Sequence, residues 1–136
     1  MAYWAKAAET FVPSYQLSGK PYLTGSASAT SLTTTAEKIT FPTLTRWIII
    51  ENTGSSAIRF GFSKNGVNAN GATDRHYFVL EPQGANDRGN KTERLELRCK
   101  DLWIRTDSST SGYQLLAGLT LIDDLDSTLS GSEGIG

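Results

Sequence analysis

The sequence predicts an all-β protein: an antiparallel β-sandwich, jelly-roll-like, with about seven or eight strands. Short runs of apolar and β-branched residues recur at spacings of roughly 8 to 15 residues, and turn-forming residues separate them. The composition is rich in Gly, Ser and Thr, which favours strands and turns over helices. Outside the N-terminus, no apolar pattern is long enough for a helix of more than about two turns.

The 136 residues divide into three expected regions. Residues 1–35 are an extended N-terminal arm, residues 36–122 are the β-sandwich domain, and residues 123–136 are a flexible acidic tail. The arm ends in a linker-like run of small residues at 25–31. Its aromatic side chains need burial, so we expect the arm to lie across its own domain or a neighbouring subunit. A packed N-terminal strand is the equal alternative.

The first half of the domain contains the most apolar strand. A short strand at 39–41 stops at a proline. Residues 45–51 follow and are β-branched and apolar on both faces, as in a strand that is covered on both sides. Residues 57–62 alternate, which places Ile58, Phe60 and Phe62 on one face and Arg59 and Gly61 on the other. Asn65–Gly66 then has the sequence of a tight turn with positive φ angles.

The second half is expected to contain further strands. Residues 76–80 and 93–99 alternate between the two faces of a sheet. Residues 102–105 follow after a two-residue connection, and residues 113–122 place a row of leucines and an alanine on one face. Cys99 is in phase with the leucines of its strand, so it is expected to be a buried, unreactive thiol.

Composition and charge exclude several classes of function. The chain has one Cys and one His, so the usual metal sites and the Cys–His or Ser–His catalytic pairs are not expected. Lys plus Arg is 13 and Asp plus Glu is 14, which gives no basic field for direct nucleic-acid binding. The longest apolar run, residues 47–50, is far shorter than a membrane span, and the N-terminus lacks the pattern of a signal peptide. We therefore expect a non-enzymatic protein without catalytic residues, cofactor, metal or membrane partner.

Aromatic side chains are the candidate partner-binding residues. Trp103 is out of phase with Leu102 and Ile104, so it points outward if they point inward, and an outward Trp is an anchor type of interface residue. The same alternation places members of the run 47–50 on both faces. A second covering surface is therefore required, either the other sheet or another subunit. The candidates are Trp4, Phe11, Tyr15, Tyr22 and Trp103.

A further pattern lies in the order of strand and turn residues between Phe41 and Ile122. It consists of the segments Phe41–Ile50, Asn52–Gly54, Ile58–Val67, Tyr77–Leu80, Arg94–Leu102 and Ala117–Thr120. These segments resemble the small β-rich structural proteins of tailed bacteriophages that decorate or cement the capsid. The resemblance covers most of the domain and is one of strands and turns, without a catalytic signature.

The resemblance implies a virion protein that binds the outside of the capsid shell and stabilises it. Its partners would be the major capsid protein and itself, in a homotrimer at the local three-fold axes, with terminal arms over the capsid protein. It would be assembled in the host cytoplasm and reside on the capsid surface, in keeping with a chain that cannot form an internal disulfide. Two alternatives stay open: a head–tail connector, and a fibre or carbohydrate-binding β-sandwich module.

Overall fold

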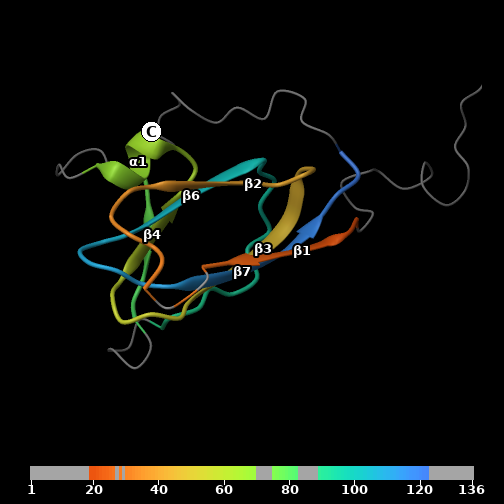
Figure 1. Cartoon of the computed structure of the whole chain (residues 1–136). Coiled ribbons are helices and arrows are strands. Elements are labelled where there is room, and N and C mark those ends of the chain that lie inside the picture. Colours follow the sequence, from red (N-terminus) through yellow and green to blue (C-terminus); the bar gives the residue numbers. More distant parts are fainter. Residues whose placement is uncertain (1–18, 27, 29, 70–74, 83–88, 123–136) are drawn as a thin grey trace, which may run out of the picture.

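The structure is a computed structural model, and two sheets dominate it (Figure 1). Within the described residues the chain forms seven β-strands and one short helix. The strands make two antiparallel sheets whose inner faces enclose one core, so the predicted all-β class is confirmed. The residues described are 19–26, 28, 30–69, 75–82 and 89–122.

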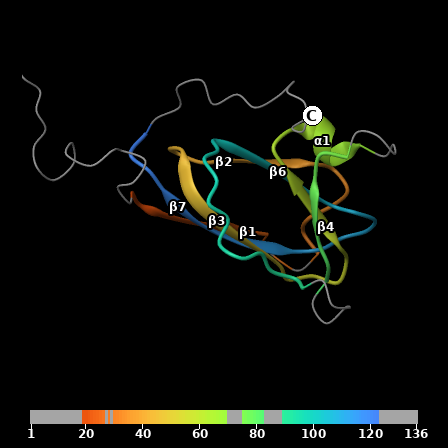
Figure 2. The ribbon, with the colours of Figure 1, turned by 180° about the vertical axis from the view of Figure 1, so that it is seen from behind.

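The first sheet has the strand order β1-β7-β3. Its strands are β1 (Pro21–Gly25), β7 (Tyr113–Leu119) and β3 (Thr45–Asn52). Figures 1 and 2 show this sheet as one layer, with β2 and β6 of the other sheet in a second layer. Along β3 the burial alternates, and Ile48 and Ile50 are fully buried. β3 is therefore a central element of the core.

Residues 90–99, which we call the edge segment, run antiparallel beside β3 on the side away from β7. Ile48 and Leu95 exchange two backbone hydrogen bonds of 2.9 Å. Further backbone bonds run from the Thr92 amide to Ile50, from the Asn52 amide to Asn90 and from the Thr45 amide to Cys99. Between them threonine hydroxyls take the place of some ladder bonds: the Ile50 amide donates to Thr92 Oγ1, and Thr45 Oγ1 donates to the Leu97 carbonyl and accepts from the Cys99 amide. Residues 93–99 therefore pair with β3 but do not form the regular strand that was predicted, because side chains interrupt the pairing.

The second sheet has the strand order β2-β6-β4-β5. Its strands are β2 (Glu37–Thr40), β6 (Asp101–Thr106), β4 (Ile58–Gly61) and β5 (Phe78–Leu80). On β6, Leu102 and Ile104 are fully buried against the first sheet. Cys99, which precedes β6, is buried as predicted, and this burial raises the pKa of its thiol.

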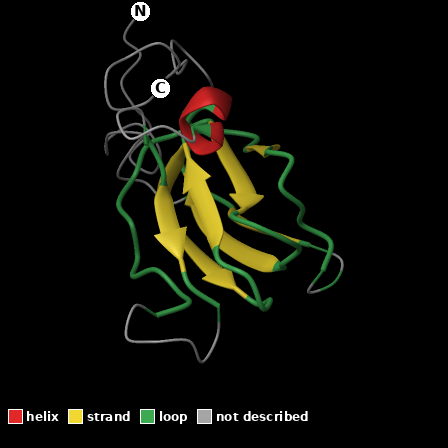
Figure 3. Ribbon diagram, turned by 90° about the vertical axis from the view of Figure 1, so that its left-hand side faces the viewer, coloured by secondary structure: helices red, strands yellow, loops and turns green. Residues whose placement is uncertain are grey.

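The single helix of the described residues, α1 (Lys64–Asn68), stands where the sequence predicts a tight turn. Ser63 caps it, because its hydroxyl accepts the Gly66 amide at 2.9 Å. A Cβ at Gly66 would lie 2.9 Å from the His76 carbonyl oxygen, so close packing is what requires this glycine. Figure 3 shows α1 (red) beside the strands (yellow). Gly66 does not have the positive φ that was predicted for it, because it lies within the helix α1.

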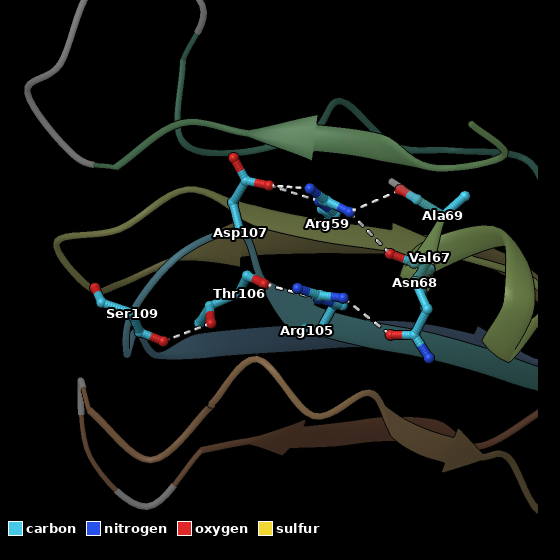
Figure 4. Close-up of polar contacts among 8 residues, drawn as sticks. All are labelled: Arg59, Val67, Asn68, Ala69, Arg105, Thr106, Asp107 and Ser109. Atoms are coloured by element: carbon cyan, nitrogen blue, oxygen red, sulfur yellow. Dashed lines mark hydrogen bonds and ion pairs between the residues drawn. The ribbon is translucent and has the colours of Figure 1, made fainter. Parts of the chain in front are cut away.

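Arg59 on β4 explains how α1 is held. Its Nη1 donates to the carbonyls of Val67 and Ala69 at 3.2 Å each, and its Nε donates to Asp107 at 2.7 Å (Figure 4). The guanidinium also lies 4.4 Å from the centre of the Tyr77 ring. Arg59 is only 9% exposed, although the alternation places it on the face opposite Ile58 and Phe60. An arginine can be buried here because its guanidinium donates to two carbonyls and pairs with a carboxylate.

The sandwich begins before residue 36, the boundary expected from the sequence. β1 pairs with β7 over its whole length, and Leu32 is fully buried and exchanges backbone hydrogen bonds with Ser111. For Pro21–Gly25, the alternative of a packed N-terminal strand therefore holds. Residues 1–18 of the expected arm and the expected tail, 123–136, lie outside the described residues.

We predict that Arg59→Met lowers the free energy of unfolding by about 2 to 3 kcal/mol, because it leaves two carbonyls near α1 and the Asp107 carboxylate without their donor. Urea unfolding of the full chain measures this loss. Arg98→Met, on the exposed side of the edge segment, is the control and should change stability by less than about 0.5 kcal/mol. Equal midpoints for the two variants would contradict the role given to Arg59.

We also predict that two N-terminal deletions behave differently. Removal of residues 1–18 leaves β1 and Leu32 in place, so thermal unfolding should stay cooperative. Removal of residues 1–35 takes away a strand of the first sheet and a fully buried leucine, and this protein should not unfold cooperatively. Circular dichroism melts of both proteins test this. A cooperative melt of the protein that lacks residues 1–35 would show that β1 is dispensable.

Candidate interaction surface

The outer face of the first sheet carries apolar side chains in register. On β3, Trp47 and Ile49 point away from the core, since Ile48 and Ile50 point into it. Leu116 of β7 lies opposite both Ile49 and Leu23 of β1. The next row joins Trp47, Gly118 and Pro21 across the same strands. We call this set the outer apolar face: Pro21, Leu23, Trp47, Ile49, Leu116 and Gly118.

Trp47 lies against the backbone of β7. A Cβ at Gly118 would come within 2.6 Å of the indole Cε2, so only glycine leaves room for the ring. From the edge segment, the Arg94 guanidinium lies 5.9 Å from the ring centre, and Arg94 also pairs with Glu96. The indole is thereby positioned between the sheet and a charged side chain. It remains partly accessible, as interface tryptophans are.

Polar groups border the outer apolar face on one side. Gln114 Nε2 donates to Glu51 Oε2 at 2.7 Å, and Asn90 Nδ2 donates to the other oxygen of that carboxylate at 3.4 Å. An apolar centre with a polar rim is the usual anatomy of a protein interface. Leu23, on the edge strand β1, is 75% exposed, and water therefore covers a leucine that a partner would bury.

Trp103 lies on the opposite sheet and points outward, as the alternation predicts. Its neighbours Leu102 and Ile104 are fully buried, and it is partly exposed beside Lys38, whose Nζ lies 6.0 Å from the ring centre. Tyr22 is different, because its ring packs edge-on against Phe41 with centroids 5.2 Å apart. Tyr22 therefore contributes to the core rather than to an arm.

The structure does not bring the predicted partner-binding residues together. Tyr22 and Trp103 belong to different sheets, and Trp4, Phe11 and Tyr15 lie outside the described residues. Sequence reasoning missed Leu23 and Leu116. Leu116 is out of phase with the buried Leu115 and Ala117, which was a signal of an outward apolar residue in the same strand.

Chemical groups elsewhere in the described residues are sparse. These residues contain no cluster of three or more His, Cys, Asp or Glu side chains that could hold a metal. Burial raises the pKa of Tyr113, and burial together with the nearby charge of Arg59 lowers the pKa of Arg105. None of the helices in the part of the chain that the structure describes is long and apolar enough to cross a bilayer. The outer apolar face is thus suited to burying apolar surface against a partner.

Comparisons with protein families, with curated proteins and with solved structures found no match to this chain. The likeness to phage decoration proteins therefore stays a prediction from strand and turn residues.

Proposed function

We propose that this chain is a non-enzymatic structural protein of a tailed-bacteriophage virion, which binds the outside of the capsid shell and stabilises it. The observation that carries the proposal is the outer apolar face, where three strands align apolar side chains that their own fold covers only in part. The resemblance of the strand and turn segments to decoration proteins supports the choice of partner. In this account the outer apolar face contacts the major capsid protein.

We infer that the sandwich is an eight-stranded jelly roll whose sixth strand is the edge segment. With that segment added, the first sheet has the order β1-β7-β3-edge segment, beside β2-β6-β4-β5. Numbered along the chain, these are strands 1-8-3-6 and 2-7-4-5. This is the order produced when a long antiparallel hairpin is rolled into two sheets. The jelly-roll fold is common among virion proteins, which agrees with the proposed role.

The mechanism is stabilisation by mass action. A protein that binds the assembled shell but not its separated subunits adds its binding free energy to the assembled state. Each fully buried leucine or tryptophan adds roughly 1.5 to 3 kcal/mol before the costs of association. Because a shell has many equivalent sites, a modest gain at each is multiplied over its whole surface. A trimer at the local three-fold axes would join three such contacts and raise the avidity.

Purified virions test the proposal through the copy number of this protein. A decoration protein is present in hundreds of copies, on the order of the shell's equivalent sites, whereas a connector or fibre is present in about a dozen. We expect the former, by quantitative mass spectrometry. A copy number near a dozen would support the head–tail connector or the fibre module instead.

A pair of leucine variants locates the binding surface. Leu23→Glu places a charge in the outer apolar face at a position that is 75% exposed, so folding should be kept and shell binding should fall by at least about tenfold. Leu121→Glu is the matched control, because Leu121 is also exposed, at 48%, but lies after β7 and outside that face. Co-sedimentation with shells stripped of the protein measures both. Equal binding by the two variants would mean that another surface carries the contact.

A further inference from the structure

A groove of about 620 Å³ opens between β5 and the edge segment, at the end of the sandwich away from β1. Phe78 projects there and is 64% exposed, with its ring 5.6 Å from that of Phe60. Leu95 and Leu97 line the opposite wall and are only partly buried. The large apolar side chains of the lining are Phe60, Phe62, Phe78, Leu80, Leu95 and Leu97.

Two strand edges border this groove. β5 is the outermost strand of its sheet, and among the described residues its ladder partner is β4 alone. The edge segment pairs with β3 on one side, so its other side faces the groove. Strand edges beside an apolar channel accept an extended segment, whose backbone pairs with an edge while alternate side chains enter the channel. The groove therefore has the form of a receptor for a strand.

The chain itself contains a segment of matching chemistry. Residues 1–18 include Tyr3, Trp4, Phe11 and Tyr15 but only two charged side chains, which suits an apolar channel. This segment enters the sandwich at Gly19, whose amide donates to the Leu119 carbonyl at the start of β1. Eighteen residues of extended chain reach roughly 60 Å, several times the width of a sheet of this size.

We propose that residues 1–18 of one copy bind in the groove of a neighbouring copy. Residues 1–18, the donor segment, lead into β1 at one edge of the sandwich, and the groove opens at the other edge. A head-to-tail arrangement brings the donor edge of each copy beside the acceptor edge of the next. Around a closed ring every groove is then filled, which is the property of a heterologous cyclic interface. The inference rests on the proposed self-association and is independent of binding to the shell.

Cysteine crosslinking between two differently tagged full-length proteins tests the exchange. One protein carries Glu93→Cys, an exposed position on the rim of the groove, and the other carries Ser14→Cys or Ala7→Cys. The native Cys99 is 1% exposed and should not react. With a short flexible bis-maleimide, we expect at least about tenfold more mixed dimer than with the control Lys38→Cys, which lies on β2, the opposite edge strand of the second sheet.

Two results would overturn the proposal. If, at both donor positions, the mixed dimer is no more abundant than with the control, the segment does not enter the groove. A double variant that crosslinks only within single chains would show that each copy fills its own groove.

A substitution in the groove separates this inference from the proposed function. Phe78→Glu should shift the native mass from oligomer towards monomer, because it places a charge where the donor strand binds, while its exposure allows folding. Leu23→Glu should leave the oligomer intact and lose only shell binding. An oligomer unaffected by Phe78→Glu would contradict strand exchange and leave shell binding through the outer apolar face untouched.

Discussion

The structure depends on one constraint: β3 is apolar on both faces and must be covered on both. Ile48 and Ile50 are fully buried on the inner side, where the second sheet covers them. On the outer side Trp47 is covered only in part, by β7 at Gly118 and by Arg94, and Ile49 is only partly buried. The inner side thus makes the sandwich, and the outer side makes a surface whose apolar groups need a partner.

The ends of β3 connect this strand to the rest of the molecule through satisfied polar groups. Asn52 is completely buried, and its amide nitrogen donates to the carbonyls of Ser56 and Leu80 while its oxygen accepts from Gly54 and Ser111. One side chain therefore joins both sheets and two turns. At the other end the Thr45 hydroxyl holds the edge segment. Because every polar group at these sites is paired, β3 can be buried without leaving an unmatched donor or acceptor.

Alternation in the sequence was sufficient to predict the core strands and the outward direction of Trp103, because period-two patterning reports directly which face is buried. It failed where side chains bond to backbone. Alternation gives the face of β4 on which Arg59 lies, but it does not show that Asp107 and the carbonyls of Val67 and Ala69 bind the guanidinium there. The edge segment was expected to be a regular strand, because alternation does not show that Thr45 and Thr92 replace ladder bonds. The phase of Leu116 could have identified it as an outward residue, but the phase of one leucine does not reveal its neighbours on β1 and β3.

The central claim is that the outer apolar face of the first sheet is covered in the assembled particle. A cryo-electron microscopy reconstruction of the virion, at a resolution that separates strands, tests it most directly. The account predicts that β1, β7 and β3 face the major capsid protein, with Leu23 and Trp47 buried at the contact. A reconstruction in which this sheet faces solvent while another surface meets the shell would contradict it.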